Sequence, residues 1–103
     1  MRKLKITVMK VDFNEELCKE YGAPDIVPCP VHEVGQEMYV IDGKKPPELC
    51  GGAWGSFEKY AFALTHGLDS FTFPGWLGKE KVCINTCNDG LRPVTFKIEV
   101  VEE

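Results

Sequence analysis

Residues 81–101 read KVCINTCNDGLRPVTFKIEVV and contain two strand-like segments joined by a turn. From residue 94 onward apolar and polar side chains alternate, which is the period of a half-buried strand. The turn, Asn88-Asp89-Gly90, consists of residue types that tolerate the positive φ of hairpin turns. The pattern predicts an antiparallel hairpin with strands over residues 81–86 and 94–101.

The preceding sequence adds two strands and a short helix. Alternation around Ile6 predicts a strand over residues 3–11, and a second strand is expected over residues 37–41. The short helix is expected over residues 15–21, with Asp12 or Asn14 as its N-cap and Gly22 as its stop. Three prolines in residues 23–33 predict a loop there.

The main helix is expected from about Ala53 to His66. It carries an apolar stripe at helical spacing, formed by Trp54, Phe57, Ala61 and Leu64. Phe62 lies outside that stripe, so the helix is either wedged between two surfaces of one domain or part of a subunit interface. Aromatic residues in the loop 68–80 predict a lid on the core; they are Phe71, Phe73 and Trp76. The whole chain, residues 1–103, is expected to form a single α+β domain, with a small, mostly antiparallel sheet of about four strands, one main helix and one short helix.

Charge and hydropathy exclude two classes of partner. Twelve basic residues against sixteen acidic ones give a net charge of −4, so no basic field exists to bind nucleic acid. No apolar run approaches the roughly 20 residues of a membrane span. The N-terminus lacks the apolar region of a secretion signal, which predicts a cytoplasmic protein.

Five cysteines suggest a metal or a reactive thiol. An odd number of cysteines in a reducing compartment argues against structural disulfides. Cys29, Cys50, Cys83 and Cys87 together would suit zinc or an iron–sulfur cluster. Alternation along this strand places Val82 and Ile84 on one face and Cys83 and Cys87 on the other. Cys83 and Cys87, however, lie about 13 Å apart along one straight strand, which is too far to share an ion. The alternative is that these thiols are small buried hydrophobes, as is expected for Cys18.

The candidate nucleophiles are Cys50 and Cys29. Cys50 precedes Gly51-Gly52 at the start of the main helix, a position that favours a thiolate. His32 and His66 are more typical of solvent-facing residues than of catalytic bases. A ligand could approach the helix entry; the residues expected to bind it are Gly51, Gly52, Trp54, Asp89 and Arg92. Arg92 could instead form a surface ion pair with Asp89.

The chain resembles a family of small prokaryotic proteins that has no established activity. The resemblance rests on Cys29-Pro30, on Cys50 before Ala53-Trp54, and above all on residues 87–94, CNDGLRPV. It covers most of the chain and implies kinship without a mechanism.

Three functions remain open from the sequence. The first is a cytosolic thiol-rich domain that binds a small ligand or a metal and forms a homo-oligomer. The second is a cysteine-dependent redox or nucleophilic enzyme that uses Cys50 or Cys29. The third is an oligomeric interaction module without catalysis, with Phe62 and residues 71–76 as its contact surface.

Overall fold

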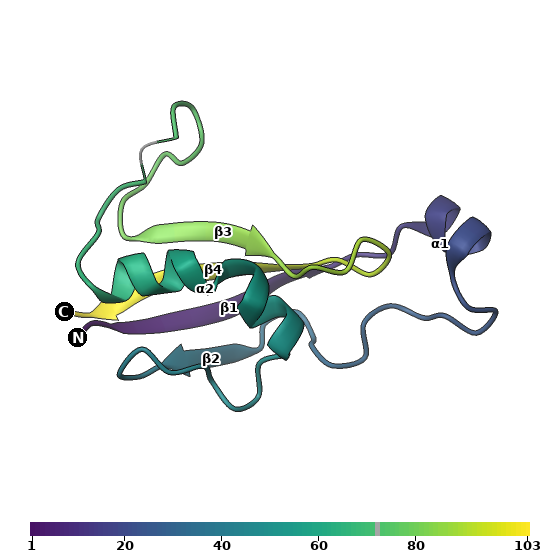
Figure 1. Ribbon diagram of the computed structural model, residues 1–103, viewed down its shortest axis with the longest axis horizontal. Coiled ribbons are helices and arrows are strands. Elements are labelled where there is room, and N and C mark those ends of the chain that lie inside the picture. Colours follow the sequence, from purple (N-terminus) through teal and green to yellow (C-terminus); the bar gives the residue numbers. More distant parts are fainter. Residues whose placement is uncertain (72) are drawn as a thin grey trace.

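The fold of this computed structural model, which describes residues 1–71 and 73–103, is a four-stranded antiparallel sheet with one helix lying across one face (Figure 1). The strand order is β2-β1-β4-β3. The strands are β1 Lys3–Val11, β2 Glu37–Val40, β3 Val82–Thr86 and β4 Val94–Glu102; the helices are α1 Glu15–Tyr21 and α2 Gly51–Thr65. The predicted α+β class and the β3–β4 hairpin are confirmed.

The core lies between α2 and the sheet. Alternating side chains of β1, β2 and β4, together with Cys83 of β3, point toward the helix and are buried, as the alternation in β1 and β4 predicts. The Phe57 ring of α2 lies 5.3 Å from that of Phe96 in β4. Most of the predicted helical stripe is buried, with Trp54 at its edge. Thr65, a polar residue at the end of α2, is also buried.

The opposite face of the sheet carries charged side chains. Lys5 pairs with Glu37 at 3.5 Å, and Lys97 with Glu99 at 3.0 Å. Cys83 lies on the other side of β3, among the core residues. The predicted alternation in β3 is therefore correct, with Ile84 exposed and Cys83 buried.

Helix α1 extends beyond the end of the sheet (Figure 1). The radius of gyration is 14.6 Å, against about 13 Å for a compact chain of this length. Backbone hydrogen bonds connect the segment before α1 to the β3–β4 turn, since the Asn14 N–H donates to the Leu91 carbonyl at 2.9 Å. The Asn14 side chain donates to the Gly90 carbonyl and does not cap α1.

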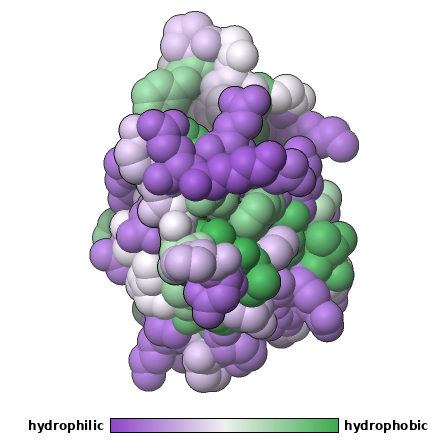
Figure 2. All heavy atoms as spheres, turned by 90° about the vertical axis from the view of Figure 1, so that its right-hand side faces the viewer, coloured by the Kyte–Doolittle hydropathy of each residue, from purple (hydrophilic) through white to green (hydrophobic). Residues whose placement is uncertain are grey.

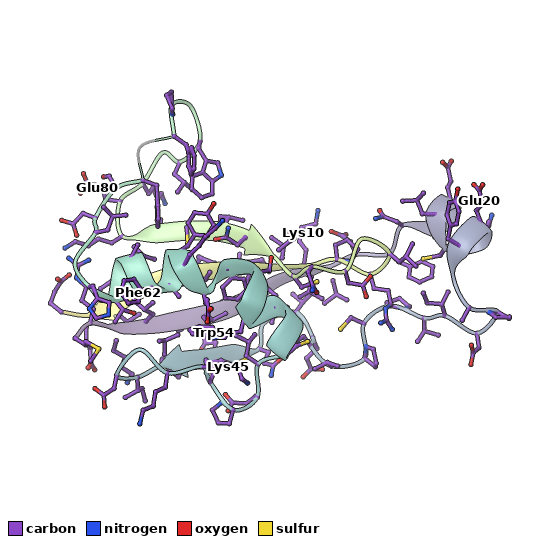
Figure 3. The ribbon with its side chains drawn as sticks, in the orientation of Figure 1. Lys10, Glu20, Lys45, Trp54, Phe62 and Glu80 are labelled. Carbon is purple, nitrogen blue, oxygen red and sulfur yellow. The ribbon has the colours of Figure 1, made fainter. Side chains whose placement is uncertain are left out.

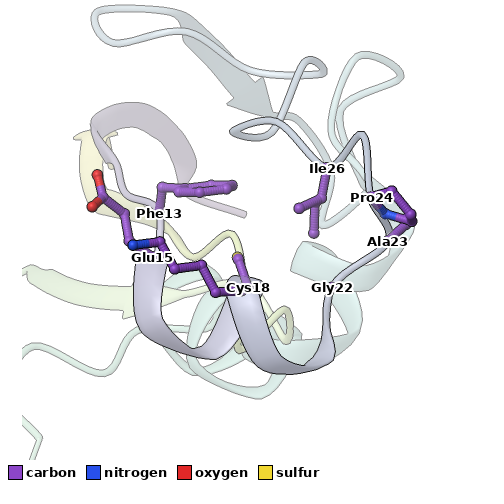
Figure 4. Close-up of a pocket in the computed structure, with 8 residues that line it drawn as sticks. Phe13, Glu15, Cys18, Gly22, Ala23, Pro24 and Ile26 are labelled. Carbon is purple, nitrogen blue, oxygen red and sulfur yellow. The ribbon is translucent and has the colours of Figure 1, made fainter.

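The end of the molecule that carries α1 exposes apolar surface. Figure 2 shows green patches between hydrophilic side chains at this end. Exposed apolar residues in α1 and the loop after it include Leu17, Tyr21, Val27 and Val31. Figure 4 shows Phe13 and Ile26 on either side of a hollow beside α1.

The aromatic loop packs only partly on the core. Phe71 and Trp76 lie within 6 Å of Tyr60 of α2, with ring centroids 5.4 and 5.7 Å away. Phe73 remains mostly exposed, packed against Trp76 alone among the described rings. Phe62 also projects from α2 into solvent, 66 % exposed, at the position labelled in Figure 3. The predicted lid therefore consists of Phe71 and Trp76.

Candidate functional site

A cavity of about 340 Å³ lies where four segments of the chain meet near the start of α2. These segments are the loop before β2, the first turn of α2, the β3–β4 turn and the first residue of β4. The lining residues are Cys29, Pro30, Val31, His32, Cys50, Ala53, Cys87, Asn88, Asp89, Arg92 and Val94. Most of the residues predicted for a thiol or ligand site therefore surround one space.

Cys83 does not belong to this cavity. Its side chain is completely buried in the core, and burial raises the pKa of its thiol to about 12. Across residues 1–71 and 73–103, no three His, Cys, Asp or Glu side chains are placed to hold a metal ion. The four-cysteine site for zinc or an iron–sulfur cluster is thus not assembled, because Cys83 faces α2 from within the sheet.

Cys50 occupies the N-cap of α2 and is the one exposed cysteine among the five, all of which are described. The first intrahelical bond is donated by the Trp54 N–H to the Cys50 carbonyl at 3.1 Å. The Cys50 side chain makes no capping hydrogen bond, and the first turn contains no acidic residue. The early N–H groups of α2 therefore have no capping side chain from Cys50 and no carboxylate in the first turn.

The two glycines belong to the helix, which begins two residues earlier than predicted. Gly52 permits close packing of the β3–β4 turn, because a Cβ atom there would lie 2.7 Å from Asn88 Oδ1. Around Gly51 a Cβ atom would meet nothing within 4 Å. A larger residue at position 52 would therefore force the Asn88 side chain to move, whereas Gly51 leaves the helix entry open.

His32 positions Cys50. It is only 5 % exposed, which contradicts the expectation of a solvent-facing residue. Its Nε2 accepts a hydrogen bond from the Cys50 N–H at 3.2 Å, so the proton is on Nδ1, which donates to Gln36 Oε1 at 2.8 Å. The neutral ring also meets Phe96 edge-on, with centroids 5.5 Å apart. With both ring nitrogens engaged, His32 holds the loop 29–32 against the start of α2.

Asp89 organises the β3–β4 turn and orients Arg92. Its Oδ1 accepts the N–H groups of Leu91 and Arg92 at 2.9 and 3.1 Å. Its Oδ2 accepts from Arg92 Nε at 3.0 Å. The hydrogen bond from the Leu91 N–H, followed by those from Arg92, holds the pKa of the Asp89 carboxyl below its usual value. The expected Asp89–Arg92 pair is therefore formed.

That pair leaves part of Arg92 free. Asp89 uses only the Nε edge, and within the described part of the chain neither Nη group of Arg92 makes a hydrogen bond. Arg92 lines the cavity, and its side chain is about a third exposed. A planar group with four free N–H donors is suited to a carboxylate or a phosphate.

The other two thiols differ in their surroundings. Cys87 Sγ accepts a hydrogen bond from the Val94 N–H at 3.3 Å and faces the Arg92 carbonyl at 4.0 Å, so it closes the turn. Cys29 is partly buried, and its Sγ makes no hydrogen bond with any described residue. Cys29 lines the same cavity as Arg92.

Trp54 is not part of this site. It lines a separate groove on the other side of α2, together with Phe62 and Met1. Conversely, sequence reasoning did not select Asn88 or His32 as site residues. The position of Asn88 in the predicted turn could have identified it as a site residue, whereas nothing in the local sequence predicts the contact between His32 and Cys50.

Comparison with known proteins adds no relative: no family model, no curated protein and no solved structure matches this chain. Within the described residues, no helix has the length and apolar character needed to cross a membrane.

Proposed function

We propose that this protein binds a small anionic ligand in the cavity between Arg92 and the start of α2. The observation that carries the proposal is that Arg92, a residue that lines the cavity, is oriented by Asp89 through Nε and keeps its Nη edge free. A cavity of about 340 Å³ is within the usual range for small-molecule sites. Carboxylates and phosphates are the groups that a free guanidinium edge pairs with most strongly.

The helix entry supports the same ligand chemistry. The N-terminus of α2 carries partial positive charge, and neither Cys50 nor an acidic residue neutralises it. An anion held by Arg92 would therefore also meet backbone N–H donors, with Gly51 leaving room to approach them. Five unpaired cysteines favour a reducing compartment such as the cytoplasm for this function.

A second candidate function is thiol chemistry on the bound ligand. It is favoured by Cys50, which is exposed at the edge of the same cavity and is held there by His32. Binding and chemistry are separable, because a sulfur-free anion tests the first without the second.

Isothermal titration with suberate, a flexible dicarboxylate, tests the binding proposal. Arg92→Gln is expected to weaken binding roughly tenfold or more, because a charge-assisted bidentate pair is lost. Lys10→Gln is the matched control, since it removes the same charge from an exposed side chain outside the cavity. Suberate and inorganic phosphate that both fail to bind the wild-type protein, or equal affinities in the two variants, would contradict the proposal.

A further inference from the structure

The cavity is lined by several cysteine side chains, which anion binding alone does not require. Three cysteines from three separate segments, Cys29, Cys50 and Cys87, line it together with Arg92. We infer that this cavity reacts with small anionic disulfides, with Cys50 as the attacking thiol and Cys29 as the resolving thiol. This inference rests on the proposed function, because Arg92 selects the charge of the disulfide.

The three thiols are assigned by their contacts. Cys50 is exposed, so an incoming disulfide reaches its sulfur first. Cys87 accepts the Val94 N–H and stabilises the turn, which leaves it the least free to move. Cys29 is partly buried and lines the same cavity as Arg92, and no described residue holds its sulfur. The bond from the Cys50 N–H to His32 keeps the segment that carries Cys29 beside Cys50.

The reaction is thiol–disulfide exchange and balances without a further oxidant. The Cys50 thiolate attacks one sulfur of the small disulfide, forming a protein–ligand disulfide and releasing one small thiolate, which takes a proton from water. The Cys29 thiolate then attacks the Cys50 sulfur and releases the second small thiol. Two protein thiols are oxidised to one disulfide, and the small disulfide is reduced to two thiols.

The charge of the site makes a distinctive prediction. The protein carries a net charge of −4, so its overall field attracts cationic disulfides and repels anionic ones. Arg92 and the α2 N-terminus reverse this preference only if the reaction occurs in the cavity. Faster reaction with the anionic reagent would therefore show that the reaction takes place in the cavity.

The experiment compares 3,3′-dithiodipropionate, a dianion, with cystamine, a dication that has the same disulfide core. Reaction of the intact protein is quenched with acid and followed by mass spectrometry and peptide mapping. We expect the anionic reagent to react roughly tenfold faster than cystamine at low salt, and this ratio to fall to one or below in Arg92→Gln. Cys29→Ser is expected to accumulate the mixed disulfide on Cys50, whereas Cys87→Ser still forms the Cys29–Cys50 bond.

Cys50→Ser is expected to abolish the charge-selective reaction. Faster reaction with cystamine in the wild type, an adduct on another cysteine, or an unchanged ratio in Arg92→Gln would overturn the inference. Suberate, the sulfur-free dianion of matching length, separates the two proposals. Suberate binding without any Cys50 adduct leaves anion binding intact and rejects the exchange reaction. If Cys50 forms an adduct, but suberate does not bind and Arg92→Gln leaves the ratio of reaction rates unchanged, both the anion site and its role in the reaction are rejected.

Discussion

Raising the pH should weaken the fold through Cys83. In the folded protein burial raises the pKa of this thiol from 9.0 to about 12. The unfolded chain therefore loses its Cys83 proton first, and stability falls as the pH rises above 9 toward 12. At pH 10 the unfolded thiol is about nine-tenths ionised and the folded one hardly at all, so the free energy of unfolding falls by about 1.4 kcal/mol relative to pH 7.

The assay is urea unfolding at pH 7 and pH 10 of the wild-type protein and of Cys83→Val. Valine has a similar size and no proton to lose, so the variant reports the combined effect of all the other titratable groups, the four remaining cysteines included. We expect the wild type to lose about 1.4 kcal/mol more than Cys83→Val between the two pH values. Equal losses would show that Cys83 is accessible to water in the folded state, and would refute its separation from the thiols of the cavity.

Three further predictions concern the residues that build the cavity. His32→Phe keeps a ring against Phe96 but leaves the Cys50 N–H and Gln36 without their partner, so thermal unfolding should show a loss of about 1–3 kcal/mol, and an unchanged melting temperature would contradict the role of His32. Gly55→Ala, whose Cβ meets nothing within 4 Å, should stabilise α2 by about 0.5–1 kcal/mol, whereas Gly52→Ala should gain less, because its Cβ would lie 2.7 Å from Asn88 Oδ1 and the Asn88 side chain would have to move; urea unfolding that gives the same gain for both would count against the close approach of Asn88. Asp89 has a lowered pKa when folded, so its contribution is present above the ordinary carboxyl pKa and is lost as the pH falls through its folded value; acid titration of stability should therefore be shallower for Asp89→Asn than for the wild type, and parallel curves would exclude the contribution.

The strands and the main helix were predictable because their signals are local. Alternation in β1 and β4 gives both the strand and the buried face, and the helical spacing of Phe57, Ala61 and Leu64 gives the side of α2 that meets the sheet. The start of α2 was placed two residues late because glycine is a weak helix former. At an N-terminus, where the N–H groups have no intrahelical partners anyway, that weakness matters less.

The site was predicted only in part, since it depends on contacts between distant segments. The residue types of Cys29, Cys50, Asp89 and Arg92 indicated chemistry, and the structure brings all four around one cavity. Which other residues line the cavity with these four was less predictable. Cys83 was included because strand alternation places it on the same side as Cys87, but the core covers that side at residue 83 and opens into the cavity at residue 87.

Two further differences have the same origin. Trp54 was expected at the ligand because it lies close to Cys50 in the sequence. Its neighbour Ala53 lines the cavity, but successive helical residues point about 100° apart, and Trp54 lines the separate groove with Phe62. His32 was expected in solvent because a histidine in a proline-rich loop usually is, and its burial depends on the Cys50 N–H, eighteen residues away. Sequence periodicity contains no information on such contacts.

The most direct test of anion binding at the start of α2 is a titration of the ¹⁵N-labelled protein with suberate, followed by amide chemical shifts. We predict saturable changes at the backbone amides of Gly51, Gly52 and Ala53 and in the turn from Asn88 to Arg92, and none of these in Arg92→Gln. Changes confined to the groove of Trp54, Phe62 and His66, or no saturable change anywhere, would contradict the account.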